Sequence, residues 1–274
     1  MPEEINKSYL KEKQNKTTKY LEARIKIHQF TENKQGFHEW IFDKLDMDSI
    51  DSNPIKILDV ACGTSVFWKK NQQKFKNKKI DITLTDFADA MLDKAKENTK
   101  DVDFNNVNYE IADIEKLEKY YNNFDIVFCH NAVYHAEDKK LALNNLKNCL
   151  NDKKSSFVSI TTNSEKHMLN VYTIGRSLDK KFPTDRIIDS WTEEVADKML
   201  PSIFNYKKII EEEKLKVTDL EILMDYVASG VEPRGIVLRD DFYDEYRSIA
   251  KKEIDKKGYF QIIKRSPLYI CKKN

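Results

Sequence analysis

Acidic and amide side chains follow four short apolar segments in the first half of the sequence. Asp59 lies where the first segment meets a glycine-containing turn, and Asp86, Asp113 and Asn131 each end a later segment. Carboxylates and amides can make the hydrogen bonds that the hydroxyl and amino groups of a nucleotide require. In open parallel sheets, ligands bind outside the carboxyl ends of the strands. These four residues therefore predict a ligand site at that edge of a sheet.

Each of these residue types has a specific use in such a site. Asp86 is placed to accept hydrogen bonds from two vicinal ribose hydroxyls. Asp113 can accept a hydrogen bond from an adenine amine while Ile114 packs on the ring, and Gly63 lets the backbone approach a ligand closely. The alternative role of Asp86 and Asp113 is that of helix N-caps. Asp59 is equally suited to satisfying loop amides from inside.

Alternating strands and helices are predicted to position these residues. Five segments are too short for helices and rich in β-branched residues, so they are predicted to be strands. They read IKILDVA (55–61), IDITLTD (80–86), VNYEIAD (107–113), FDIVFCH (124–130) and SSFVSITT (155–162). Helical patterns lie between them, as at 89–99 and 140–150. The alternation predicts a doubly wound α/β sheet with parallel strands and helices on both faces.

The segments before and after this alternation have other patterns. Residues 8–45 have helical spacings and belong to a predicted N-terminal helical segment, 1–50, ahead of a main domain, 51–274. An insertion at about 163–200 is predicted to be helical and to form a cap. NYKKIIEEEKLKV (205–217) is strand-like, Asp219 is a predicted N-cap, and a last helix is expected at about 240–254. GYFQIIKRSPLYICKK (258–273) indicates a hairpin or a bent terminal strand.

Composition excludes several classes of partner. The 274 residues carry 47 Lys and Arg against 46 Asp and Glu, and a net charge of +1 gives no field for a polyanion. The four cysteines are widely spaced, which suggests neither a metal site nor a disulfide framework. No apolar run approaches a membrane span, and the N-terminus lacks the apolar core of a signal peptide. A cytoplasmic protein with a small partner, and neither nucleic acid nor membrane, is the expectation.

Four motifs in this order resemble those of the class I methyltransferases that use S-adenosylmethionine. They are ILDVACGTS (57–65), LTDFADAMLDKA (84–95), IADIEKL (111–117) and FDIVFCHNAVYHAED (124–138). The resemblance implies a Rossmann-like, seven-stranded, mostly parallel sheet in the order 3-2-1-4-5-7-6, with an antiparallel seventh strand. It also implies a set of cofactor-binding residues: Asp59, Ala61, Gly63, Asp86, Phe87, Met91, Asp113, Ile114, His130 and Asn131.

A further resemblance links RIKIHQFTENKQGFHEWIFDKL (24–45) and VTDLEILMDYVASG (217–230) to bacterial small-molecule methyltransferases. It implies an acceptor of modest size under a helical cap. Arg24 could then hold the carboxylate of the cofactor's methionine part in a bidentate fork, or be an ordinary surface residue. Trp40 could cover the cofactor, or pack the N-terminal helices on the sheet.

Two histidines are candidate catalytic residues. His135 could act as a general base near neutral pH, although the family often has a non-catalytic histidine at this point. His167 could act on the substrate side or be a surface or packing residue. The first motif departs from the family at Ala61 and Ser65, where glycine is usual. If φ at Ala61 is negative, alanine costs little conformational free energy there and the loop is slightly tighter.

The sequence thus predicts transfer of a methyl group from S-adenosylmethionine to an O, N or S nucleophile of a small molecule. The leaving thioether is neutral, so alignment and desolvation can carry the reaction. The alternatives are a non-catalytic S-adenosylmethionine-binding regulatory or assembly protein, an NAD-dependent oxidoreductase and an RNA methyltransferase. The oxidoreductase is disfavoured because two of the three fingerprint glycines are missing, at Ala61 and Val66.

Overall fold

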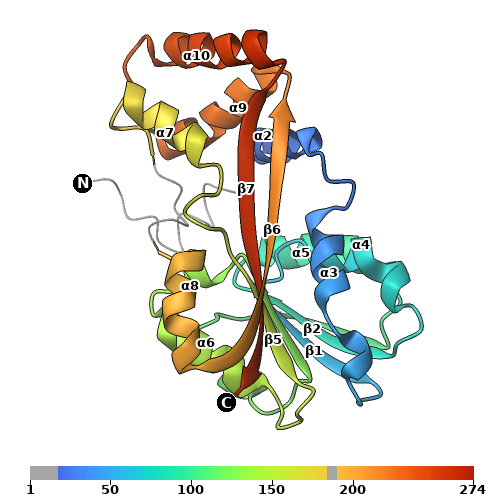
Figure 1. Cartoon of the computed structure of the whole chain (residues 1–274). Helices are drawn as coiled ribbons and strands as arrows, with labels where there is room; N and C mark the ends of the chain where they lie inside the picture. The colour runs from blue at the N-terminus through green and yellow to red at the C-terminus, as the bar shows by residue number, and fades with distance from the viewer. Residues whose placement is uncertain (1–17, 184–189) are drawn as a thin grey trace. The chain divides into compact units, whose positions relative to one another are not determined.

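A seven-stranded sheet in the order β3-β2-β1-β4-β5-β7-β6 forms the centre of the structure. The computed structural model describes residues 18–183 and 190–274 (Figure 1). The strands are β1 (Ile55–Val60), β2 (Ile80–Asp86), β3 (Asn106–Ile111), β4 (Ile126–His130), β5 (Phe157–Thr161), β6 (Phe204–Val217) and β7 (Phe260–Lys273). The first five are parallel, and β7 pairs with β5 in the antiparallel sense. The predicted sheet order is therefore confirmed.

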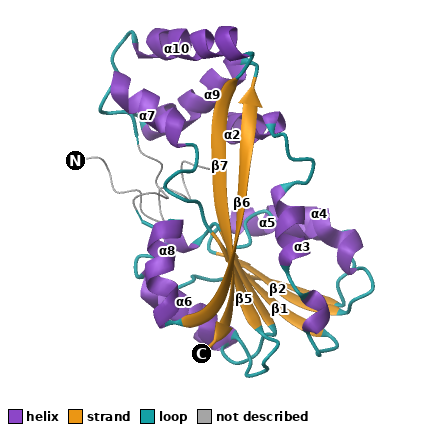
Figure 2. Cartoon of the chain, in the orientation of Figure 1, coloured by secondary structure: helices purple, strands orange, loops and turns teal. Residues whose placement is uncertain are grey.

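Helices connect the strands, as Figure 2 shows. They are α2 (Thr18–Lys26), α3 (Phe37–Lys44), α4 (Val66–Phe75), α5 (Asp89–Thr99), α6 (Lys139–Cys149), α7 (Leu169–Leu178), α8 (Glu193–Met199), α9 (Leu220–Val231) and α10 (Phe242–Lys257). Asp219 caps α9 as predicted, because its carboxylate accepts from the backbone N–H groups of Glu221 and Ile222. The segment 258–273 is one strand without a hairpin, and α7 and α8 lie in the predicted helical insertion.

Apolar side chains on both faces of the central strands explain why these segments pair. Ile57 and Leu58, adjacent on β1, are both fully buried but belong to different core clusters. The cluster with Leu58 includes residues of α6 and α8, and the cluster with Ile57 includes residues of α3 and α4. Figure 1 shows these helix pairs on opposite sides of the sheet. Burial on two faces requires nearly continuous apolar strands, and this is what the sequence has.

The chain forms two compact units. The sheet unit comprises 35–163, 190–210 and 266–274, and the helical unit contains the described residues 18–34, 164–183 and 211–265. This division differs from the expected one at residue 50, because β6 and β7 each contribute residues to both units and α3 packs with α4. Pairings between distant segments decide the boundary, and local sequence patterns do not report them.

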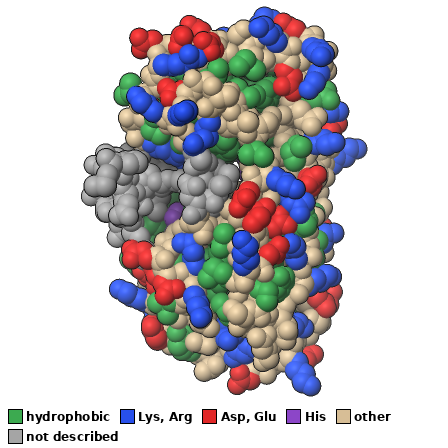
Figure 3. Space-filling view, turned by 60° about the vertical axis from the view of Figure 1, so that its left-hand side comes forward, with side chains coloured by type: hydrophobic (Ala, Val, Ile, Leu, Met, Phe, Trp, Pro, Cys, Tyr) green, Lys and Arg blue, Asp and Glu red, His purple; other side chains and the backbone are tan. Residues whose placement is uncertain are grey.

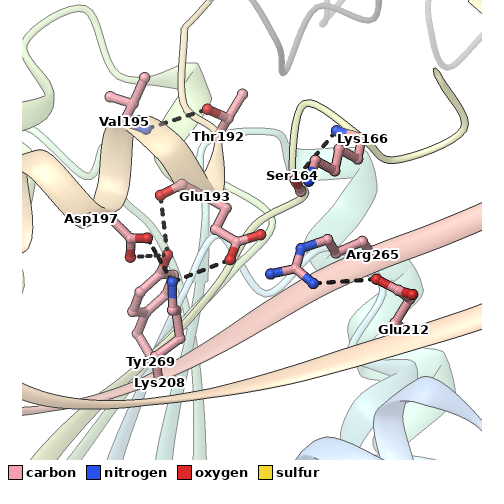
Figure 4. A network of polar contacts seen from close by, with 10 residues as sticks. All are labelled: Ser164, Lys166, Thr192, Glu193, Val195, Asp197, Lys208, Glu212, Arg265 and Tyr269. Atoms are coloured by element: carbon pink, nitrogen blue, oxygen red, sulfur yellow. Dashed lines mark hydrogen bonds and ion pairs between the residues drawn. The ribbon is translucent and has the colours of Figure 1, made fainter.

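A buried polar network attaches α8 to β6 and β7 within the sheet unit (Figure 4). The Nζ atom of Lys208 lies 3.1 Å from Oε1 of Glu193 and 2.6 Å from Oδ2 of Asp197. The Tyr269 hydroxyl donates to Oδ1 of Asp197 at 2.9 Å. Glu193 is 4% exposed, and a carboxylate so deeply buried requires such partners. The network therefore fixes α8 on the sheet.

The helical unit has its own apolar core. Val171 of α7, Leu223 of α9 and Tyr246 of α10 belong to one buried cluster. An ion pair between Lys264 and Glu213 joins β7 to β6 in this unit, and both side chains are largely buried. The apolar cluster explains why α7, α9 and α10 form stable helices there.

Charges of both signs are interspersed over the surface that Figure 3 shows. This agrees with the near balance of 47 basic and 46 acidic residues. Among the described residues, no helix combines the length and the apolar character needed to cross a membrane.

Candidate active site

The ends of the first five strands form a continuous polar edge in the sheet unit. Backbone hydrogen bonds link neighbouring strands beyond their last residues. The N–H of Cys62 donates to the carbonyl of Thr85 at 2.8 Å, that of Ala112 to Asp86 at 3.0 Å, and that of Asn131 to Thr161 at 3.1 Å. The sheet thus brings together Gly63, Asp86, Asp113, His130 and Asn131, as the sequence predicted.

The turn after β1 uses left-handed backbone conformations at every second residue. The φ angles are 55° at Ala61, 55° at Gly63 and 54° at Ser65. The negative φ considered for Ala61 is therefore wrong. This alternation explains why glycines at alternate positions suit such a turn, since a Cβ in the left-handed region costs about 1–2 kcal/mol. The chain adopts the same turn with two of those glycines replaced.

We predict that Ala61→Gly and Ser65→Gly each stabilise the fold by about 0.5–1 kcal/mol, because relief of left-handed strain exceeds the entropy that glycine adds to the unfolded chain. Urea unfolding measures this free energy. The matched control is Ala88→Gly, at φ −109°, which should destabilise the fold. Destabilisation by the two turn variants would contradict the strain argument.

Asp86 already holds the turn. Its Oδ2 accepts from the backbone N–H of Gly63 and its Oδ1 from that of Ala88, each at 3.0 Å. The carboxylate is 4% exposed, and burial raises its pKa. A carboxylate has about four acceptor sites, so two of them can still receive hydroxyl groups. The N-cap residue of α5 is Ala88, so the N-cap alternative for Asp86 is wrong, and its ligand role stays a prediction.

Asp59 lies beneath the turn and accepts a hydrogen bond from the indole Nε1–H of Trp68 at 2.7 Å. The residue is 7% exposed. Burial raises the pKa of Asp59 to about 7, although the bond from Trp68 opposes the rise and the nearby Asp86 adds to it. The bond joins β1 to α4, so Asp59 has an interior structural role in which its shown partner is an indole of a helix and not a loop amide.

The raised pKa of Asp59 predicts a pH dependence of stability. Asp59 makes its full contribution to the free energy of unfolding below about pH 4, the pKa of an aspartate in the unfolded chain. That contribution falls by up to about 4 kcal/mol as the pH rises to about 7, the pKa in the folded protein. Asp59→Asn removes the charge and keeps an acceptor for Trp68, so its stability relative to the parent should increase between pH 4 and pH 7. Urea unfolding across this range tests the difference, with the exposed Asp51→Asn as control. Parallel curves for parent and Asp59→Asn would refute the assignment.

The adenine-side residues have mixed environments. Oδ1 of Asp113 accepts from the N–H of Glu115 at 3.1 Å, which forms a local turn. Ile114 is 7% exposed and packs in the core cluster beneath α6. Phe87 and Met91 are half-buried, and the ring of Phe87 lies 6.5 Å from that of His135. Their cofactor contacts stay predictions.

Asn131 has an unusual environment at the end of β4. Its φ is 50°, a left-handed conformation that asparagine tolerates better than most residues. Its side-chain Oδ1 is buried and has no hydrogen-bond partner. A buried unpaired acceptor costs about 1–3 kcal/mol, so a native site that contains one has a use for it.

The remaining candidates are His135, Trp40, Arg24 and His167. His135, in the short helix Val133–His135, is half-buried and has its ring 4.2 Å from that of Tyr134. Trp40 is 8% exposed and stacks on Phe37 at 5.9 Å, which matches the packing alternative. Arg24 and His167 belong to the helical unit, and their roles stay predictions. Burial lowers the pKa of His167 to about 3, which makes it a poor general base.

Sequence reasoning missed His38, Phe67 and Ser159, which surround His130. Nε2 of His130 lies 2.8 Å from Oγ of Ser159, and its ring centroid lies 5.3 Å from that of Phe67. The ring of His38 packs on Phe67 from another direction, at 6.1 Å. No sequence motif links these residues. The one signal for His38 in the sequence was its position next to the apolar stripe of α3.

Comparisons with known proteins identify the fold of this chain. In the solved structures, a protein from Bacillus halodurans described as a methyltransferase superposes with a TM-score of 0.58 at 14% identity, covering 87% of this chain and 99% of its own. The [4+2]-cyclase SpnF gives a TM-score of 0.51 at 12% identity, covering 86% and 79%. Both show likeness of fold.

A curated relative adds a match in sequence. Malonyl-[acyl-carrier protein] O-methyltransferase 1 of Ilyobacter polytropus is 35% identical over 94 residues. The match covers 34% of this chain and 33% of the relative.

The sheet order and the polar edge around the turn after β1 are those of the class I S-adenosylmethionine-dependent methyltransferases. The model of the methyltransferase domain family matches residues 51–214, and the chain belongs to this family. Members of this class take the methyl group from S-adenosylmethionine.

The residues present fit that cofactor. A Cβ built on Gly63 would meet no protein atom within 4 Å, so the turn leaves room for a ligand beside the backbone. Asp86 retains acceptor capacity, and Asn131 supplies a buried unpaired acceptor.

Proposed function

We propose that the chain transfers the methyl group of S-adenosylmethionine to an O, N or S atom of a small molecule. The observation that supports this most is the polar edge of the sheet unit, where Asp86 accepts from the N–H of Gly63, a Cβ on Gly63 would meet no protein atom within 4 Å, and Asn131 carries a buried unpaired acceptor after β4. Asp86 accepts the ribose hydroxyls, Asp113 accepts from the adenine amine, and the turn 61–65 lies against the methionine part. The cofactor supplies an activated methyl group, and the protein aligns the acceptor with it and excludes water.

Two observations support a small acceptor. The net charge is +1 and the face drawn in Figure 3 carries both charges, which does not favour a polyanion such as RNA. The curated relative, by its name, is an O-methyltransferase of a malonyl group on an acyl-carrier protein, and we transfer to this chain only the idea that the methylated group itself is small.

Thermal-shift measurements test the cofactor assignment. S-adenosylmethionine and S-adenosylhomocysteine should each raise the unfolding temperature, because they bind only the native state, and NAD should not. Absence of any shift with both sulfur compounds would refute the proposed function. Transfer of labelled methyl from S-adenosylmethionine to extract components separates an enzyme from the non-catalytic alternative, and salt-sensitive RNA binding would favour the RNA alternative.

A further inference from the structure

Two histidines from distant parts of the sequence share one aromatic neighbour in the sheet unit. His38 lies in the first turn of α3, and His130 is the last residue of β4. Their rings lie 6.1 Å and 5.3 Å from the ring of Phe67, and His130 also packs 5.2 Å from Phe128. This His38–His130 pair lies beside the cofactor turn, since extending the β1–β4 register by two residues places His130 level with Ala61.

The hydrogen bonds of the two histidines indicate which ring nitrogens remain available to a ligand. Nε2 of His130 is engaged by the Ser159 hydroxyl, and its Nδ1 has no hydrogen-bond partner among the described residues. Nδ1 of His38 is buried and unpaired. A buried unpaired N–H is rarer and more costly than an unpaired lone pair, so the proton of His38 belongs on Nε2. His38 therefore offers an N–H donor there.

Both imidazoles are uncharged at neutral pH. Burial lowers the pKa of His130 to about 3, and the neighbouring His38 lowers it further. Burial also lowers the pKa of His38, with Lys70 acting in the same direction and Glu39 against it. Bases this weak cannot take a proton from an alcohol or a phenol at a useful rate. The pair can supply hydrogen bonds but not general-base catalysis.

We propose that the His38–His130 pair binds the methyl acceptor, and that the acceptor atom is a carboxylate oxygen. This inference rests on the proposed methyl transfer. A carboxylate with a pKa of about 4 is ionised at neutral pH, so it needs no base. Its oxygen forms a bond to the methyl carbon as the carbon–sulfur bond breaks, and the electron pair of that bond remains on sulfur. The products are a methyl ester and a neutral thioether, and no proton moves.

The surroundings of the pair favour this reaction over others. An anionic oxygen and a sulfonium lose both charges in the transfer, so a site poor in water favours the transition state. Phe67 and Phe128 are buried. The uncharged imidazoles bind the carboxylate by hydrogen bonds and add no positive charge, whose attraction would be lost when the reacting oxygen becomes neutral. An amine acceptor keeps the positive charge and gains nothing from such surroundings.

Mild alkali distinguishes the classes of product, whichever molecule accepts the methyl group. The protein is incubated with S-adenosylmethionine labelled in the methyl group and a clarified bacterial extract. Methyl esters release labelled methanol in mild alkali, whereas N-methyl, S-methyl and ether products do not. We expect alkali-labile label, at a rate that is flat between about pH 7 and pH 9 because the pKa values of both imidazoles are lowered from their ordinary value of 6.5.

Substitutions of His38 test whether the His38–His130 pair takes part in ester formation. His38→Ala should slow single-turnover ester formation by about 10- to 100-fold, as loss of a hydrogen bond to a charged group does. His38→Gln keeps an N–H donor and should recover most of the rate. The control is His28→Gln, at a histidine of the helical unit, which should keep the parent rate. The affinity for S-adenosylmethionine should stay within about two-fold in all variants.

The possible failures are separable. Label transferred only in alkali-stable form would overturn the carboxylate assignment and retain the methyltransferase. A His38→Ala variant that forms ester at the parent rate would overturn the role of the pair. Absence of any label transfer, with cofactor binding intact, would overturn the proposed function together with this inference.

Discussion

Asp86→Ala should weaken the binding of S-adenosylmethionine by about 100-fold or more. Two hydroxyl groups bonded to one carboxylate are each worth at least about 1.5 kcal/mol, and about 2.8 kcal/mol corresponds to 100-fold. The substitution also frees the N–H groups of Gly63 and Ala88, which hold the turn. Isothermal titration calorimetry measures the dissociation constant directly.

The control for Asp86 is its neighbour Asp89, an exposed carboxylate in the first turn of α5. Asp89→Ala should bind S-adenosylmethionine like the parent. Asp86→Asn keeps one acceptor oxygen, and its affinity should fall between parent and Asp86→Ala. If Asp86→Ala binds within about three-fold of the parent, as a folded protein by circular dichroism, the ribose assignment is wrong.

Gly63→Ala should separate stability from cofactor affinity. A Cβ there meets no protein atom within 4 Å, so the fold loses only the cost of the left-handed φ of 55°, about 1 kcal/mol. The added methyl group enters the space assigned to the cofactor. Overpacking of about 1–3 kcal/mol predicts an affinity lower by about five- to 150-fold. Urea unfolding and calorimetry measure the two quantities.

Gly235→Ala is the matched control for Gly63→Ala. Gly235 has a φ of 62° and open space around its Cβ position, but it lies in the helical unit. It should lose similar stability and retain the parent's affinity for S-adenosylmethionine. Equal affinity in the two variants would show that the turn does not approach the cofactor.

Much of the fold is encoded locally. β1, β4 and β5 are short apolar runs that are almost entirely buried between the two sheet faces, which made them recognisable, whereas β3, at the edge of the sheet, is largely exposed. Asp219 before the apolar stripe of α9 marked a helix start that the structure confirms. Because parallel strands end at one edge, the sequence also predicted that Asp86 and Asn131 lie at a common edge.

Tertiary structure decided the details of the site. The left-handed φ angles of Ala61 and Ser65 follow from bonds that close the turn, including Ser65 N–H to the Cys62 carbonyl at 3.0 Å and Gly63 N–H to Asp86. Residue types alone would have favoured negative φ at Ala61, because alanine avoids the left-handed region.

The pairing of His38 with His130 was invisible in the sequence for a related reason. The two histidines come from different elements, and the ring of each lies near the ring of Phe67. Their lowered pKa values also depend on burial, which folding creates. The sequence by itself determined the strands, the sheet order and the carboxylates at its edge. Long-range packing decided the shape of the cofactor turn, the charge state of the imidazoles and the division into two units.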